Sequence, residues 1–175
     1  IASCLVGSEM CIRDSVKRFL ASGFGVGLFW KTYFGEKKGG GTLASFLFAL
    51  ITYVFNLNVF ELSILFIVLV LIYLVSVEDS QASEDPSWIT LDEIVGMSLV
   101  TIASPSRLLP LLAGFLVFRL SDIMKQPKFV AELEKHPGKL GVLFDDLGAG
   151  LMGLLSATIV NQIINCLLYT SPSPR

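Results

Sequence analysis

The chain has 175 residues, of which 53% are hydrophobic and 16% are charged, with a formal net charge of −2. A typical soluble domain carries about 25% charged residues, so this composition argues against an ordinary soluble enzyme. The mean hydropathy of +0.71 points the same way, toward a membrane protein. The length is enough for one domain and too short for two of ordinary size.

Both ends of the chain resemble translated sequencing adapter. Leu5 to Ser15, LVGSEMCIRDS, resembles the in-frame translation of a transposase adapter, and Cys166 to Arg175, CLLYTSPSPR, resembles its reverse complement. We therefore expect residues 1–15 and 166–175 to be non-native, as tags and fusion remnants are, and residues 16–165 to form one domain. The cysteines all lie in or beside these ends: Cys4, Cys11 and Cys166. No disulfide, zinc or redox site is predicted.

Apolar runs predict an all-α fold, a compact multi-helix membrane protein with about four membrane-associated helical segments plus shorter helices. Val59 to Val77 is long enough to span a bilayer as a helix of about 20 residues, and Leu43 to Leu57 is a shorter or tilted partner. Ile94 to Ala103 and Leu108 to Leu120 flank the sequence SPSR, and Leu147 to Ile164 forms a last run. Because Ile94 to Ala103 is too short to span, we expect it to be re-entrant or buried in protein.

The charged residues gather between these runs. Acids fill residues 78–93, and a mixed set of acids and bases fills residues 119–146. If the first two runs form one hairpin and the next two another, both segments lie on one face of the membrane. Lysines and arginines before the first hairpin lie on that face too. Cationic residues favour the cytoplasmic side, so the sequence predicts that this face is cytoplasmic.

The stretch DPSWITLDEIVG, Asp85 to Gly96, holds the first candidate site. Asp85 precedes a proline and is expected to cap a helix. Four residues then follow at the spacing of one helical face: Ile89, Asp92, Glu93 and Gly96. A capped helix with solvated acids is the simple alternative. Carboxylates at the edge of an apolar run are costly unless paired, protonated or bound to a cation, which favours a site at Asp92 and Glu93.

The stretch FRLSDIMK, Phe118 to Lys125, is the second charged constellation. Asp122 lies one helical turn from both Arg119 and Lys125. This spacing fits an intrahelical ion-pair ladder. It also fits a cation site at Asp122 with a phosphate held by Arg119 and Lys125.

The stretch LGVLFDDLGAGLMG, Leu140 to Gly153, is the third. We expect Asp145 and Asp146 to open a helix, a position where acids also serve as ordinary caps. Small residues behind them predict close helix packing: Ala149, Gly153 and Ala157.

Three acidic clusters at three helix ends favour a single site for a hard cation. Oxygen ligands beside arginine and lysine suit Mg²⁺ bound together with a phosphate. Other phosphate motifs are missing, because KKGGGT, Lys37 to Thr42, places its lysines before its glycines, and GFGVG, Gly23 to Gly27, lacks the dinucleotide-binding spacing. His136 is the only histidine, which excludes mechanisms that need two.

Four blocks of the chain together resemble the signature blocks of the bacterial phosphatidylglycerophosphatase A family, in the same order. They are GTLAS (41–45), DPSWITLDEIVG (85–96), FRLSDIMKQP (118–127) and LGVLFDDLGAG (140–150). The resemblance implies a Mg²⁺-dependent membrane phosphatase that removes the terminal phosphate of phosphatidylglycerophosphate and yields phosphatidylglycerol. The chain departs from the family at Ser121, where an aromatic is usual, and at Lys125 to Lys128, where K-P-W-P is usual.

Together with the resemblance, the three clusters give a set of expected roles. The expected metal ligands are Asp85, Asp92, Glu93, Asp122, Asp145 and Asp146. The expected catalytic residues are Asp92, Glu93, Asp122 and Asp146, and the expected phosphate-binding residues are Thr42, Arg119 and Lys125. The substrate is expected to be a phospholipid of the bacterial cytoplasmic membrane, with the site facing the cytoplasm and no nucleic-acid partner. Attack by water is expected, and an aspartyl-phosphate intermediate stays open as the alternative.

An ion-transport or ion-sensing membrane protein is the rival interpretation. It would use buried carboxylates as an ion path and place them at mid-membrane. Glu61 is the only acid within a long apolar run, and it stands near the start of that run. The motif blocks therefore favour the enzyme.

Overall fold

The computed structural model describes residues 13–35, 39–79, 88–104, 107–126 and 138–170. Within these ranges the chain is helical and contains no strand, which confirms the predicted all-α class. A first helical segment covers residues 13–21. The helices that follow are α2 (Val26–Phe34), α3 (Gly40–Phe55), α4 (Val59–Ser76), α6 (Leu91–Ala103), α7 (Leu108–Met124) and α9 (Lys139–Thr170).

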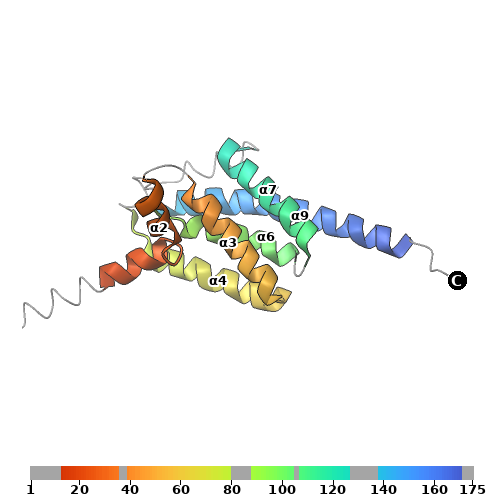
Figure 1. The fold of residues 1–175 in the computed structure, drawn as a ribbon, viewed down its shortest axis with the longest axis horizontal. Coiled ribbons are helices and arrows are strands. Elements are labelled where there is room, and N and C mark those ends of the chain that lie inside the picture. Colours follow the sequence, from red (N-terminus) through yellow and green to blue (C-terminus); the bar gives the residue numbers. More distant parts are fainter. Residues whose placement is uncertain (1–12, 36–38, 80–87, 105–106, 127–137, 171–175) are drawn as a thin grey trace, which may run out of the picture.

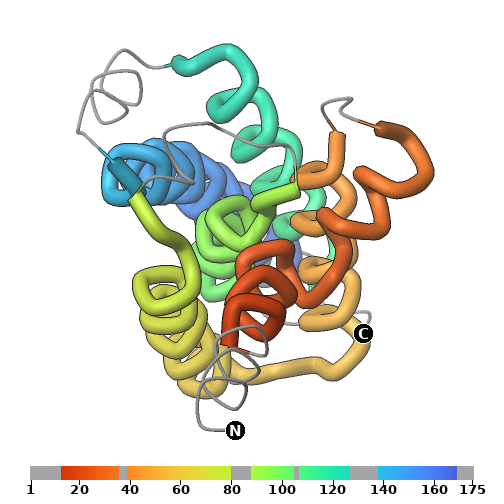
Figure 2. Tube along the Cα trace, turned by 90° about the vertical axis from the view of Figure 1, so that its left-hand side faces the viewer, coloured from red at the N-terminus to blue at the C-terminus, as the bar shows by residue number. Residues whose placement is uncertain are grey.

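Helix α6 lies at the centre of the bundle, surrounded by α3, α4, α7 and α9 (Figure 2). Most of its residues are buried, including Val95, Met97 and Val100. The expectation that this short apolar run is enclosed by protein is confirmed. Its first helical residue is Leu91 and its N-cap residue is Thr90. Ile89 therefore precedes the helix and does not share its face, contrary to the sequence prediction, and the expected cap Asp85 lies outside the described residues.

Small residues bring the long helix α9 into close contact with α6 and α7. A Cβ atom at Gly150 would overlap the backbone carbonyl of Gly96 in α6. A Cβ at Gly153 would lie 2.7 Å from the carbonyl oxygen of Gly114 in α7. Ala149 is fully buried beside them. The predicted small-residue strip is thus a helix-packing surface.

The distribution of polar and apolar side chains fits a lipid environment. Helices α4 and α9 are long and apolar enough to cross a membrane. Only 22% of an 18-residue apolar stretch of α4 and 11% of such a stretch of α9 are buried inside the protein. The core helix of a soluble protein would instead be mostly buried. Large hydrophobic side chains face outward, among them Ile67, Leu71, Val75, Leu116, Leu155 and Ile159. Small polar side chains lie inside and donate hydrogen bonds to carbonyls of their own helices, as Ser98, Thr101 and Ser104 do. The fold is that of a membrane-associated helical protein.

The starts of α3, α6 and α9 and the ends of α4 and α7 meet at one end of the bundle (Figure 1). Helices α4 and α9 are joined there by the Lys139 Nζ, which donates hydrogen bonds to the carbonyls of Leu74 at 2.8 Å and Val77 at 3.2 Å. The Tyr73 hydroxyl donates to the Lys139 carbonyl at 2.9 Å, and the Lys139 N–H donates to the Asp79 carboxylate at 3.0 Å. These bonds satisfy backbone groups at both helix ends and fix their positions.

Candidate active site

Glu93 of α6 lies directly against the first turn of α3. Gly41 makes this contact possible, because any Cβ at that position would overlap the Glu93 carboxylate. The fully buried Ser45, one turn further along α3, donates a hydrogen bond to the Gly41 carbonyl at 2.7 Å, and its Oγ lies 3.5 Å from the Glu93 Oε2. Sequence reasoning did not predict these contacts of Gly41 and Ser45. The only signal was that both stand in the GTLAS block, four residues apart.

Arg119 of α7 joins two acids from different helices. Its Nη1 pairs with the Glu93 Oε2 and also with the Asp122 Oδ2, the latter at 2.9 Å. The predicted pair of Arg119 and Asp122 within one helix is therefore present. The Arg119 side chain is only 12% exposed, and its Nε has no hydrogen-bond partner among the described residues.

Lys125 forms an ion pair with Asp145 of α9. The sequence pattern predicted Lys125 as a neighbour of Asp122 on the same helix and did not predict this contact between helices. Lys125 ends α7 as its C-cap residue with φ of 51°, so the chain leaves the regular helix at this residue. The contact follows from the packing of α7 against α9.

Asp145 and Asp146 do not open their helix, and this expectation is wrong. Helix α9 begins at Lys139, about two turns earlier, and Asp79 and Tyr73 form hydrogen bonds with this first residue. The two acids are therefore inside the helix and cannot act as caps. They are only 4% and 5% exposed, and the Oδ1 of each has no hydrogen-bond partner among the described residues.

Asp92 and Asp146 complete the cluster. Asp92 is buried, and one of its carboxylate oxygens accepts a hydrogen bond from the Glu93 N–H at 3.0 Å. A Cβ at Gly96, one turn after Asp92, would lie 2.7 Å from the Asp146 carbonyl oxygen, which places these parts of α6 and α9 in contact. The charges of Asp92, Asp122 and Glu93 all act on the Asp146 carboxyl. Three helices thus bring their acids to one place.

The cluster holds more acids than bases. Burial raises the pKa of Glu93 to about 8, Arg119 opposes the rise, and the charges of Asp92 and Asp122 add to it. Five carboxylates, Asp92, Glu93, Asp122, Asp145 and Asp146, stand with two cations, Arg119 and Lys125. Buried negative charge of this kind is costly unless a proton or another cation neutralises it.

The residues fit a hard metal ion in chemistry, although they are not arranged around one. Among the described residues, no three carboxylates stand in a metal-holding arrangement. Glu93, Asp122 and Asp145 are instead paired with Arg119 and Lys125. The donors are all oxygen atoms, and two buried carboxylate oxygens lack a partner within the described part of the chain, which suits Mg²⁺ or a similar cation. Asp85 is outside the described residues.

Thr42 lies at the rim of the cluster. It is partly buried in the first turn of α3, next to Gly41. Backbone N–H groups at the start of a helix are not bonded within the helix and attract anions. Thr42 is thus one residue from the contact of Gly41 with Glu93, and its expected role in phosphate binding stays a prediction.

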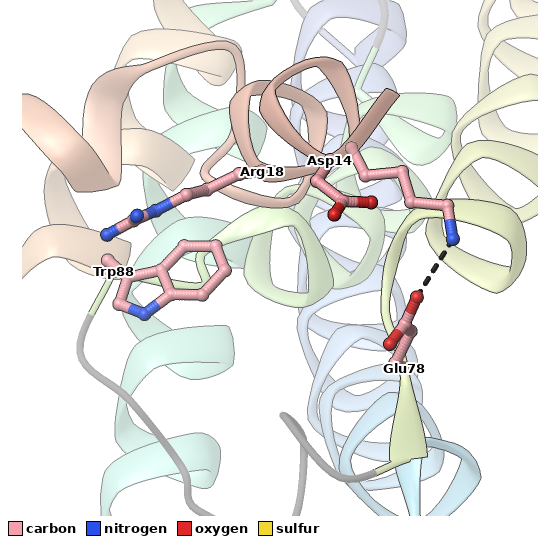
Figure 3. Close-up of a pocket in the computed structure, with 5 residues that line it drawn as sticks. Asp14, Arg18, Glu78 and Trp88 are labelled. Carbon is pink, nitrogen blue, oxygen red and sulfur yellow. Dashed lines mark hydrogen bonds and ion pairs between the residues drawn. The ribbon is translucent and has the colours of Figure 1, made fainter. Parts of the chain in front are cut away.

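A pocket of about 300 Å³ lies outside the cluster and is lined by Asp14, Lys17, Arg18, Glu78 and Trp88 (Figure 3). The Lys17 Nζ and the Glu78 Oε1 are 2.9 Å apart, and the Arg18 guanidinium stacks 5.3 Å from the centre of the Trp88 ring. The pocket contains none of the predicted site residues. Its cations are already engaged with Glu78 and Trp88, so it is not our candidate active site.

Comparison with known proteins identifies the family to which the chain belongs. A family model described as Phosphatidylglycerophosphatase A matches residues 19–161, a range that includes the whole cluster. The chain belongs to the phosphatidylglycerophosphatase A family. That name describes a phosphoric monoester hydrolase with a phospholipid substrate, so the predicted family is confirmed.

The phosphatidylglycerophosphatase A match is accompanied by one curated relative. This protein of Bacteroides thetaiotaomicron, named provisionally as a phosphatidylinositol-3-phosphatase, is 33% identical over 84 residues. The matched stretch covers 46% of this chain and 52% of that protein, so the chain spans about half the length of this relative. No solved structure matches the chain significantly.

Proposed function

We propose that this chain hydrolyses the terminal phosphate of phosphatidylglycerophosphate to give phosphatidylglycerol, at the cytoplasmic face of a bacterial membrane. The observation that supports it most is the meeting of Asp92, Glu93, Asp122, Asp145 and Asp146 with Arg119 and Lys125 at one end of the bundle. This end adjoins a lipid-facing apolar surface, so a lipid whose headgroup is bound here would keep its chains in the bilayer. Family membership supports the reaction class.

The two cations would bind the phosphate. The guanidinium of Arg119 offers several N–H donors in one plane, and the ammonium of Lys125 supplies a compact charge. The Thr42 hydroxyl, at the start of α3, would donate a further hydrogen bond to a phosphoryl oxygen. These groups neutralise the phosphate oxygens and hold the phosphorus in position for attack.

Mg²⁺ is the proposed cofactor, held by carboxylates of the cluster: Asp92, Glu93, Asp122, Asp145 and Asp146, with Asp85 as a further ligand. When bound, this ion would polarise the phosphoryl oxygens and make water more acidic. The chain's own contribution is to orient these oxygens and to accept the proton released by the attacking water. Glu93 is the proposed acceptor of this proton, because its carboxylate is held in place by Arg119, whose charge favours the ionised form that a base requires. Direct attack by an aspartate stays open, and trapping an acyl phosphate with hydroxylamine would reveal it.

A phosphoinositide is the second candidate substrate. The name of the Bacteroides relative supports it. The departures from the family pattern at Ser121 and at Lys125 to Lys128 leave the choice of headgroup less fixed than the reaction class. Both candidates are phosphate monoesters on a lipid headgroup, so the same groups would act on either. The assay below includes both lipids.

The test measures phosphate release by the purified chain in detergent, with and without Mg²⁺. Phosphatidylglycerophosphate, phosphatidylinositol 3-phosphate and phosphatidic acid are compared, and Mg²⁺-dependent release from the first is expected. Asp92→Asn should lower the rate at least about a hundredfold with folding intact, because it removes a buried charge from the site. Glu78→Gln is the matched control, since Glu78 is an exposed acid at the same end of the bundle and outside the cluster.

Release from none of the three lipids would refute the proposed function. An Asp92→Asn protein that works at the parental rate at limiting Mg²⁺ would remove this residue from the site.

A further inference from the structure

The carboxylates proposed to bind the cation and the basic side chains proposed to bind the phosphate form ion pairs with one another in this structure. Arg119 pairs with Glu93 and Asp122, and Lys125 pairs with Asp145. Each of these two cations therefore stands where a metal ion would otherwise balance the carboxylates. Each carboxylate in turn stands where a phosphate would otherwise balance the cation.

The pairing is incomplete, which indicates that further ligands belong here. The Oδ1 atoms of Asp145 and Asp146 and the Nε of Arg119 are buried and have no hydrogen-bond partner within the described part of the chain. Asp145 and Asp146 are both more than nine-tenths buried. Two carboxylate oxygens that are able to bind a cation and one donor that is able to bind an anion thus lie in the same cluster.

We propose that the divalent cation and the phosphate bind to this cluster as a pair, by exchange of ion-pair partners. Glu93, Asp122 and Asp145 would exchange Arg119 and Lys125 for the cation, and these two side chains would turn to the phosphate. This inference rests on the proposed function for the identity of both ligands. It goes further by stating that each ligand binds weakly without the other.

The physical reason is the cost of leaving a buried charge without a partner. A cation that binds alone must displace Arg119, whose side chain is 12% exposed, and leave its guanidinium unpaired. A phosphate that binds alone would draw Arg119 away from two acids and add negative charge beside five carboxylates. When both ligands bind, every group keeps an opposite charge. By thermodynamic linkage, each ligand must then raise the affinity for the other by the same factor.

Calorimetry on the full chain in detergent can measure this factor. Inorganic phosphate is titrated without Mg²⁺ and at saturating Mg²⁺, and Mg²⁺ is titrated without and with phosphate. Association of the two ions in solution is measured in parallel and subtracted. We expect each ligand to tighten the binding of the other by at least about tenfold, with equal factors from both titrations.

Variants separate partner exchange from simple phosphate binding. Arg119→Gln removes the competitor for Glu93 and Asp122, so Mg²⁺ should bind more tightly in the absence of phosphate while the coupling falls. Lys125→Gln removes the competitor for Asp145, so it should also tighten Mg²⁺ binding and reduce the coupling. The Lys125 side chain is 36% exposed, so this variant is less disruptive to folding than Arg119→Gln. Lys17→Gln is the matched control, because it removes the same charge from an exposed pair with Glu78 outside the cluster. It should leave both affinities unchanged.

The outcomes distinguish this inference from the proposed function. Phosphate that binds equally, or fails to bind, at both Mg²⁺ levels overturns the inference even if the chain hydrolyses lipid phosphates. Mg²⁺ binding that weakens in both Arg119→Gln and Lys125→Gln also overturns it, because the cations would then not compete with the metal. Coupled binding without any lipid hydrolysis would support the inference and refute the proposed reaction.

Discussion

Glu61 shows how the surroundings of a single acid decide its role. The sequence presents it as the one acid inside a long apolar run, where the rival interpretation would need an ion-binding group. In the structure it is exposed, and its carboxylate accepts a hydrogen bond from the Asn58 N–H at 2.9 Å while the Asn58 side chain accepts from the Phe60 and Glu61 N–H groups. This is a capping box at the start of α4. Its geometry explains the acid without an ion path.

The capping role predicts that Glu61→Gln is mild. Glutamine can accept the same Asn58 N–H, so phosphate release should stay within about twofold of the parental rate. Ion flux into vesicles that contain the protein should be absent in both forms. Loss of activity in Glu61→Gln, or an ion flux that this change abolishes, would favour the transport interpretation.

Lys125 illustrates a different constraint at the same scale. Its φ of 51° lies in the left-handed region, which residues with side chains rarely adopt. Glycine or asparagine would suit the backbone better at this helix end. A lysine here is consistent with a need for its ammonium beside Asp145.

One glycine of α3 makes room for the Glu93 carboxylate of α6. A side chain at Gly41 would push this carboxylate away and disturb its contacts with Arg119 and Ser45. The same contact brings the start of α3 and Ser45 to the cluster. The GTLAS block thus places α3 relative to the acids of α6.

Gly41→Ala is therefore expected to destabilise the fold by about 1 to 3 kcal/mol, the usual cost of overpacking. Shortening the opposing side chain with Glu93→Asp should recover much of this loss, so the two changes should be non-additive in a double-mutant cycle. Thermal unfolding in detergent provides the measurement. Additive effects of the two substitutions would show that Gly41 and Glu93 are not in the contact described here.

At the scale of the whole molecule, the charged cluster and the opposite end of the bundle are separated by an apolar surface. The end of α4, the end of α7 and the start of α9 share the cluster end, whereas the start of α4 lies at the other (Figure 1). Helices α4 and α9 are long enough to cross a bilayer between these ends. The two ends should then face opposite sides of a membrane.

Cysteine labelling tests this arrangement in a background whose own three cysteines are replaced by serine. Glu78→Cys and Gln126→Cys lie at the cluster end, and Val59→Cys lies at the other; all three positions are exposed. An impermeant thiol reagent should label the first two from the cytoplasmic side only, and the third from the outside only. Labelling of Glu78→Cys and Gln126→Cys from different sides would contradict a single site at one face.

The sequence by itself determined the helical class, the apolar runs and the family. These properties are local: hydrophobicity and length identify a helix such as α4, and a block such as DPSWITLDEIVG can be recognised without its surroundings. The spacing within one helix also predicted the pair of Arg119 and Asp122, because residues three apart in a helix are neighbours. The length of the Ile94 to Ala103 run also excluded a membrane span and left a re-entrant or a protein-buried helix as the alternatives.

Only the tertiary structure decided which acids and bases meet across helices. The pairs of Arg119 with Glu93 and of Lys125 with Asp145, and the contact of Gly41 with Glu93, depend on the relative positions of α3, α6, α7 and α9. No local pattern encodes these positions, since they result from the packing of small residues such as Gly150 against Gly96. The burial of Asp145 and Asp146 inside α9 likewise depends on the neighbouring helices α6 and α7, which pack against this part of α9.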